Sequence, residues 1–167
     1  MKEDKRLARN AQMLQECFPW FRTRLAAVIG DLEGQQIRPR IQQAWRSPAE
    51  QLEAFNTGHS KLKFGYHNAT GPNGEKQALA VDILDDDAPL APSTKYLLSL
   101  AIAARDHQLS TGLDWGLPAK LRVPIADAIA ARDTAAKISK IGWDPCHLEL
   151  TGVSVADVKA GVRPKGR

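Results

Sequence analysis

The N-terminal part of the chain repeats apolar residues with the spacing of an α-helix. From Leu7 to Leu32 these residues recur at steps of three, four or seven, which predicts helix over residues 4–32. Pro19 removes one helical hydrogen bond and crowds the preceding turn, so it marks the point where this segment can divide into two helices. Gly34 is a typical stop at the end of the segment.

Helices and short strands then alternate along the chain. Ser47, Pro48 and Glu50 form a capping-box sequence with proline at the first helical position, which predicts a helix that ends near Gly58. Apolar patterns predict further helices over residues 93–107, 118–132 and 153–162. Shorter runs predict strands over residues 37–46, 77–84 and 146–150, and a strand or turn over 109–116. This order predicts a mixed α+β domain with a small sheet.

The sequence shows no internal repeat, low-complexity tract or long linker, so we expect one domain over residues 1–167. Within it we distinguish an N-terminal helical segment (1–34), a core with the candidate chemistry (37–151) and a C-terminal helix with a basic tail (152–167). Hydrophobic residues make up 43% and charged residues 25% of the chain, proportions typical of soluble globular proteins. No apolar run approaches the roughly 20 residues of a membrane span. The charged N-terminus lacks the apolar stretch of a secretory signal, so we expect cytoplasmic synthesis without membrane insertion.

The net charge narrows the class of partner. A charge of +4 suits an anionic partner such as nucleic acid, a membrane surface or a cell-wall polymer. The sequence lacks a helix-turn-helix signature, aromatic–basic interleaving and zinc-finger spacing, so we expect no nucleic-acid binding. Cationic residues gather near the C-terminus, where a solvated tail explains them at least as well as a binding arm: Lys159, Arg163, Lys165 and Arg167.

The two cysteines are expected to be free, because a cytoplasmic chain keeps its thiols reduced. Neither Cys17 nor Cys146 has a second cysteine at metal-ligand spacing, which excludes a cysteine-rich zinc site. On the strand predicted over residues 146–150, Cys146 points away from His147, so we interpret it as a packed residue rather than a nucleophile.

Four residues form a candidate metal-binding and catalytic set: His67, Asp82, Asp144 and His147. Two imidazoles and a carboxylate suit zinc, and a further carboxylate nearby can accept a proton from water. Asp82 lies in the apolar run LAVDIL, where a buried carboxylate needs a cation, hydrogen bonds or exposure at the strand end. Taken singly, Asp82 is also explained as a strand-end turn former and His67 as a surface histidine in a glycine-rich loop.

The stretch GWDPCHLEL, residues 142–150, carries two of the four. Pro145 excludes a regular helix interior, so we expect Asp144 and His147 to emerge where a turn enters a strand. On that strand His147 and Glu149 share one face, while the two leucines share the other and point to the core. With this geometry, one of the two side chains, Asp144 or His147, can bind a metal ion while the other lies beside it.

In their order along the chain, these residues resemble the M15 family of zinc peptidases, which includes D-alanyl-D-alanine carboxypeptidases, dipeptidases and the L-alanyl-D-glutamate endopeptidases of phages. Three blocks carry the resemblance: AWRSPAEQLEAFNTGHSK (44–61), His67 followed by LAVDI, and GLDWG (112–116) followed by WDPCHLEL. They are similar to the family's Tyr-Arg-Ser-x-x-x-Gln block, to Ser-x-His-x-x-Gly-x-Ala-x-Asp, and to Asp-Trp followed by Asp-x-x-His-x-Glu.

The resemblance implies a fold, a cofactor and roles. The fold is a small α+β domain of the Hedgehog and DD-peptidase type, in which helices flank a small antiparallel sheet. The cofactor is one zinc ion, with His67, Asp82 and His147 as its ligands. Asp144 is implied as the general base, and Arg46 as the residue that holds the substrate or stabilises the developing oxyanion.

Four further residues are expected around the implied site rather than on the metal. Glu149 is expected to orient His147 or Arg46 without binding the metal itself. Trp115 and Trp143 are expected to form pocket walls or core. Ser60, in the first block, is expected either next to the metal ligands or in the substrate pocket.

The sequence departs from the family pattern between the first two ligands. Asp82 lies fifteen residues beyond His67, with NATGPNG inserted, and Gly65 stands where the family carries serine. Because closing a longer loop costs little, the ligands can keep their places. His59 is the alternative first histidine, and we expect His67 to be the ligand.

These expectations converge on a monomeric, zinc-dependent peptidase that cuts peptidoglycan stem peptides. The lack of a signal sequence favours a phage or prophage endolysin, an L-alanyl-D-glutamate endopeptidase that acts on the wall or in the host periplasm after release. A DD- or LD-carboxypeptidase or a dipeptidase is the alternative with the same chemistry. The alternative of another class is a non-catalytic cell-wall-binding module, against which Asp144 argues, since a structural metal site has no use for a base.

Overall fold

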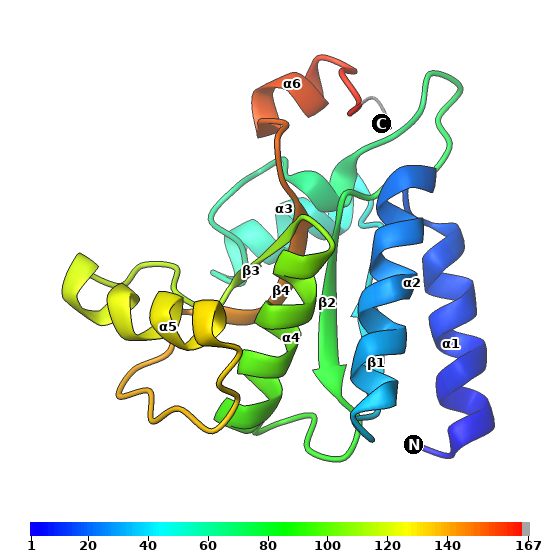
Figure 1. Cartoon of the computed structure of the whole chain (residues 1–167). Coiled ribbons are helices and arrows are strands. Elements are labelled where there is room, and N and C mark those ends of the chain that lie inside the picture. Colours follow the sequence, from blue (N-terminus) through cyan, green and yellow to red (C-terminus); the bar gives the residue numbers. More distant parts are fainter. Residues whose placement is uncertain (165–167) are drawn as a thin grey trace.

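The computed structural model describes residues 1–164 and has a mixed α+β architecture (Figure 1). Four strands form one antiparallel sheet in the order β1-β2-β4-β3. The strands are β1 (Pro39–Gln43), β2 (Ala80–Asp85), β3 (Leu109–Gly112) and β4 (Asp144–Leu150). The predicted fold class, helices around a small antiparallel sheet, is therefore confirmed. Lys165 and Arg167 of the basic C-terminal cluster lie outside the described residues.

Helices cover the sheet unequally. They are α1 (Glu3–Gln15), α2 (Pro19–Gly34), α3 (Pro48–Asn56), α4 (Thr94–Asp106), α5 (Ala119–Ala131) and α6 (Val155–Lys159), with a short 3-10 helix η1 (Tyr66–Asn68). The pair α2 and α4 packs side by side over one face of the sheet, whereas α3 lies behind it (Figure 1). Within residues 1–164, the helices are all too short or too polar to cross a bilayer.

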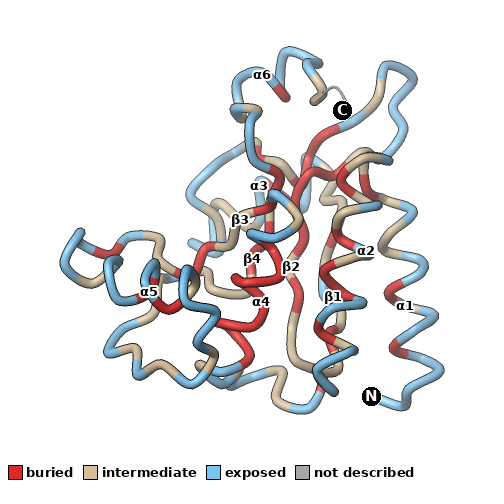
Figure 2. Tube along the Cα trace, in the orientation of Figure 1, coloured by how far each residue is buried: buried red, intermediate tan, exposed pale blue. Residues whose placement is uncertain are grey.

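The hydrophobic core lies between the sheet and the pair α2 and α4, where the trace is mostly buried (Figure 2). The strands contribute to it through side chains that all point to this one face: Val81, Ile83, Leu148 and Leu150. Because successive side chains alternate across a strand, Asp82 and His147 point to the opposite face. The face without the large helices is therefore the one that carries the polar side chains.

Pro19 divides the N-terminal helical segment into two helices. It is the first residue of α2, a position that tolerates its missing N–H. Between the two helices the N–H of Phe18 donates to the carbonyl of Ala78 at 3.0 Å, and Cys17 forms an isolated bridge with the same residue. The break thus lets the chain pair with the segment that leads into β2.

The strand boundaries follow the sheet pairing. Pro39 opens the edge strand β1, where its missing donor is tolerated. The last strand begins at Asp144, two residues before its predicted start at Cys146, because Asp144 pairs with Gly112 of β3. The candidate base therefore belongs to the sheet itself rather than to a preceding turn.

Helix α3 begins with the predicted capping box. The N–H of Glu50 donates to Ser47 Oγ at 3.2 Å, and the N–H of Ser47 donates to a carboxylate oxygen of Glu50 at 2.7 Å. These two bonds satisfy donors that a helix N-terminus otherwise leaves unpaired.

We expect Ser47→Ala to lower the free energy of unfolding by about 1 kcal/mol, because it removes the oxygen that caps α3. Urea denaturation of the two proteins measures the difference. Thr23→Ala is the control: Thr23 is an exposed residue inside α2 whose hydroxyl bonds only to the carbonyl of Pro19 in its own helix. An equal loss of stability in both variants would contradict a capping role for Ser47.

Candidate metal centre

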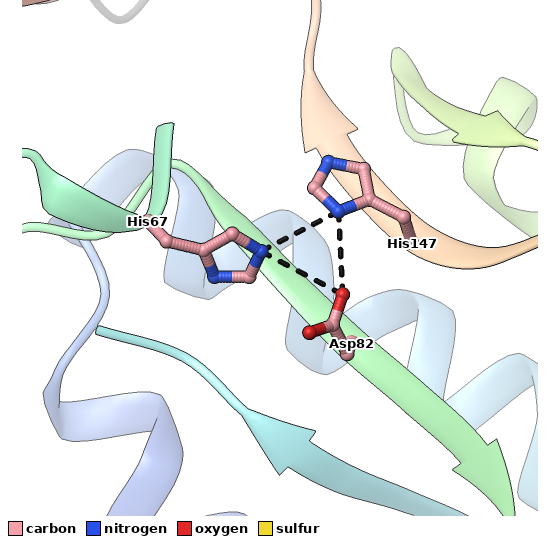
Figure 3. A group of neighbouring side chains, drawn as sticks. All are labelled: His67, Asp82 and His147. Atoms are coloured by element: carbon pink, nitrogen blue, oxygen red, sulfur yellow. Dashed lines mark hydrogen bonds and ion pairs between the residues drawn. The ribbon is translucent and has the colours of Figure 1, made fainter. Parts of the chain in front are cut away.

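Three side chains from separate parts of the chain meet on the polar face of the sheet (Figure 3). Asp82 lies on β2 and His147 on β4, directly opposite each other in the antiparallel register. His67 comes from η1. Each offers one ligand atom, and these atoms all lie within 4.8 Å of one another. The structure therefore brings together the three residues that the resemblance implied as metal ligands.

The spacing of the three ligand atoms fits a single metal ion. His67 Nε2 lies 3.4 Å from His147 Nδ1 and 3.6 Å from Asp82 Oδ1, and His147 Nδ1 lies 3.3 Å from the same oxygen. Ligands about 2.0–2.1 Å from a tetrahedral zinc ion are separated by roughly 3.3 Å, so the triangle has the size of one tetrahedral face. The group can accordingly hold a metal ion.

In each imidazole, the nitrogen that points away from Asp82, here called the outer nitrogen, lies at hydrogen-bond distance from an acceptor. His67 Nδ1 lies 2.6 Å from the carbonyl oxygen of Ala44, and His147 Nε2 lies 3.1 Å from Glu149 Oε2. If each outer nitrogen carries the proton that it donates, the lone pairs are left on the inner nitrogens, which face Asp82. Glu149 thus contacts His147, one of the two side chains that it was expected to orient.

Charge and burial shift the pKa values in this group. Burial opposes the charged form of His147, but hydrogen bonds and attraction from Asp82 and Glu149 outweigh it and raise the pKa to about 9. Burial likewise opposes the ionised form of Asp82, yet the two histidines lower the pKa of its carboxyl well below the ordinary value. Without a metal ion the cluster therefore favours a carboxylate beside a protonated imidazole.

Asp144 lies beside the three-residue group. Its Oδ2 is 4.0 Å from His147 Nδ1, and its side chain is partly buried. Burial, followed by repulsion from Asp82, raises the pKa of the Asp144 carboxyl. A carboxyl with a raised pKa next to a metal position is suited to exchange protons with water.

Arg46 reaches the group from the segment between β1 and α3. Its guanidinium donates to Gln43 Oε1 at 2.6 and 3.1 Å and to Gln51 Oε1 at 2.9 Å, and it lies 3.5 Å from Asp82 Oδ2. Gln51 is only 2% exposed and donates its amide to Ser60 Oγ and to a neighbouring carbonyl. No sequence pattern predicted a role for either glutamine, although Gln51 stands in the block similar to Tyr-Arg-Ser-x-x-x-Gln.

A cavity of about 470 Å³ opens over these residues. Its lining includes every site residue that the sequence singled out, namely Arg46, Ser60, His67, Asp82, Trp115, Trp143, Asp144, His147 and Glu149. Trp143 is 49% exposed and packs against Trp115, so the two tryptophans form a wall of the cavity. His59 also lines the cavity but lies outside the three-residue group.

The insertion between His67 and Asp82 projects from the body as a hairpin-like loop (Figure 1). An isolated bridge joins Thr70 to Lys76, and the N–H of Leu79 donates to the carbonyl of Tyr66 at 3.0 Å. The chain therefore returns beside η1 before β2 begins. For this reason the longer loop still leaves His67 and Asp82 within the same three-residue group.

The cysteines are free thiols. Cys17 is buried in the core, and Cys146 of β4 is partly buried and packs against the core. Burial raises the pKa of both thiols to about 12. Neither thiol is activated as a nucleophile, in agreement with the interpretation of Cys146 as a packed residue.

Comparison with known proteins shows the fold. No protein-family model and no curated protein sequence matches the chain. A solved structure that matches is that of the L-Ala D-Glu endopeptidase ChiX of Serratia marcescens, with a TM-score of 0.54. The match is 17% identical in sequence and covers 93% of this chain and 92% of that one. At this identity the likeness establishes a common fold, and membership of the M15 family remains a prediction.

We expect His67→Ala to abolish stoichiometric metal binding, because it removes one of three converging ligand atoms. His59→Ala is the matched control, since His59 lines the same cavity outside the group. Metal content after dialysis against zinc, measured by atomic emission, compares the two variants. Retention of metal by His67→Ala with its loss from His59→Ala would reverse the assignment.

Metal binding is also expected to release about one proton near neutral pH. The metal needs the Nδ1 lone pair of His147, whose pKa of about 9 keeps the ring protonated in the metal-free protein at that pH. The release and the accompanying pH dependence of affinity should vanish as the pH rises through about 9. Titration calorimetry in buffers of different ionisation enthalpy measures this, and Glu149→Gln should reduce the release. Binding without proton release near neutral pH would contradict the raised pKa.

Proposed function

We propose that this protein is a zinc-dependent peptidase that cleaves amide bonds in the stem peptides of peptidoglycan. The observation that carries the proposal is the pairing of a three-ligand group with an unligated carboxylate, Asp144, in one cavity. A catalytic zinc site characteristically uses three protein ligands and leaves the fourth position open. The fold is shared with an L-Ala D-Glu endopeptidase, so peptidoglycan stem peptides, which contain that bond, are the first substrate class to test.

The donor set supports zinc as the metal. Two imidazole nitrogens and one carboxylate oxygen are ligands that zinc accepts, whereas calcium and magnesium prefer shells of oxygen. When bound, zinc acidifies water and polarises a carbonyl group. Both effects are what hydrolysis of an amide bond requires.

Three protein residues around the site would supply proton transfer, oxyanion stabilisation and orientation of a metal ligand. Asp144 would accept the proton of the attacking water and pass it to the leaving amine. Arg46, fixed by its two glutamine partners, would present its guanidinium to the oxyanion that develops on the carbonyl. Glu149 would hold the His147 ring in the orientation that keeps Nδ1 toward the metal.

The bond that we propose is the one between L-alanine and D-glutamate, as in the name of the enzyme with the similar fold. A carboxypeptidase or dipeptidase acting on the same peptides is the second candidate, because it would use the same groups and differ only in the loops around the cavity. Action as a phage or prophage endolysin is part of the proposal and is supported by the sequence resemblance.

Asp144→Ala should keep one zinc ion per chain and lower hydrolysis of purified cell walls about 10²- to 10⁴-fold, the usual range for losing a general base. Loss of turbidity measures the rate, and atomic emission measures the zinc. Asp127→Ala, which removes an exposed carboxylate on α5, is the control and should leave both unchanged.

Lysis at the wild-type rate by Asp144→Ala would refute the assigned base. Mass spectrometry of the fragments released by the wild-type protein identifies the bond. New N-terminal D-glutamate supports the endopeptidase, whereas free D-alanine supports the carboxypeptidase. Wall binding without any fragment would favour the non-catalytic module.

A further inference from the structure

Asp144 faces the cavity although the alternation of β4 should turn it away. Cys146, Leu148 and Leu150 pack against the core, so the even-numbered residues of this strand point away from the cavity. A regular strand would place Asp144 with them. Its side chain nevertheless lines the cavity near His147. The strand must therefore depart from regular geometry between Asp144 and His147.

The pairing of β3 with β4 contains that departure. Thr111 pairs with Leu148, but the next residue of β3, Gly112, pairs with Asp144. One step along β3 thus corresponds to four along β4, whereas regular antiparallel pairing advances one residue on each strand. Extra residues of this kind form a bulge, a device that bends a strand and re-aims a side chain.

The bulge depends on a position without a side chain. A Cβ atom placed on Gly112 would collide with the carbonyl oxygen of Asp144 and lie 3.0 Å from its carbonyl carbon. The same atom would lie 3.0 Å from a ring carbon of Trp115. A methyl group here cannot be accommodated unless the backbone of Asp144 moves.

A second glycine allows the same close approach from the other side. A Cβ atom on Gly142 would lie 2.6 Å from the backbone nitrogen of Trp115 and 2.7 Å from the carbonyl oxygen of Gly112. The N–H of Gly142 donates to the carbonyl of Leu113 at 2.7 Å. The turn after β3 and the entry to β4 therefore touch backbone to backbone, directly beside Asp144.

We propose that Gly112 is a positioning residue whose missing side chain turns the Asp144 carboxylate toward the metal position. The inference rests on the proposed function, in which Asp144 is the general base. Gly112 has no side chain, so its effect on the Asp144 carboxylate is exerted through the backbone of Asp144. Its substitution should move the base and leave the three ligand atoms in place.

The test is Gly112→Ala in the zinc-loaded, full-length protein, with Gly30→Ala as the control. Gly30 lies in α2, and an added Cβ there meets open space among the described residues. We expect the kcat for wall-peptide hydrolysis to fall about 10- to 100-fold in Gly112→Ala, with KM and zinc affinity changed less than about threefold. Gly30→Ala should match the wild type in all three quantities.

Two outcomes of these kinetic and zinc-binding measurements would overturn the inference. One is an undiminished kcat in Gly112→Ala, and the other is loss of zinc together with activity, which would make Gly112 a support of the sheet as a whole. If Gly112→Ala does not fold, Gly142→Ala crowds the backbone of Gly112 and Trp115 from the segment just before β4, and it is judged by the same criteria.

A crystal structure of zinc-loaded Gly112→Ala separates this inference from the proposed function. Displacement of the Asp144 carboxylate with the His67, Asp82 and His147 ligands unmoved supports the positioning role, and an unmoved carboxylate refutes it. This readout needs no activity. A wild-type protein that binds zinc but releases no fragment from cell walls would refute the peptidase proposal alone.

Discussion

Asp82 and His147 face each other across the antiparallel pair β2–β4, and the geometry of the site depends on this register. Side chains alternate with a period of two, so a slip by one residue would turn one of these groups toward the core. The register is maintained by their apolar neighbours, Val81, Ile83 and Leu148, which are buried in the core between the sheet and the large helices. Burial on one face of the sheet therefore keeps a carboxylate and an imidazole together on the other.

This arrangement is electrostatically demanding without a cation. The Asp82 carboxylate is partly buried and needs a positive partner, which in the metal-free protein is the protonated His147 ring. A divalent cation among the same three atoms would take over that role and displace the proton. The features that raise the pKa of His147 are thus the features that suit the group to a metal ion.

Helix α3 joins two residues that line the cavity, Arg46 and Ser60. Arg46 lies just before the Ser47 cap, and Gln51, one turn into the helix, binds both the Arg46 guanidinium and Ser60 on the loop that follows α3. A single buried glutamine consequently links the position of the cationic group to that of the cavity wall. Since Gln51 is almost fully buried, this link is shielded from competing water.

Local pattern alone determined the order of helices and strands in this protein. The capping box at Ser47, the break at Pro19 and the apolar run of β2 act over a few residues, so the sequence records them directly. The order of His67, Asp82 and His147 along the chain was also enough to nominate them as a metal-binding set. The identity of the metal, the reaction and the division of the chain into three segments stay predictions.

Only the tertiary structure decided how these residues are used in space. It brings His67 rather than His59 to the group, places Gln43 and Gln51 on Arg46, and turns Asp144 against the alternation of its strand. Each of the three depends on loop closure, side-chain packing or strand register. Helical and strand periodicity describe single segments, so they carry no information on how Gly112 meets the backbone of Asp144, and that contact arises only when β3 and β4 pair.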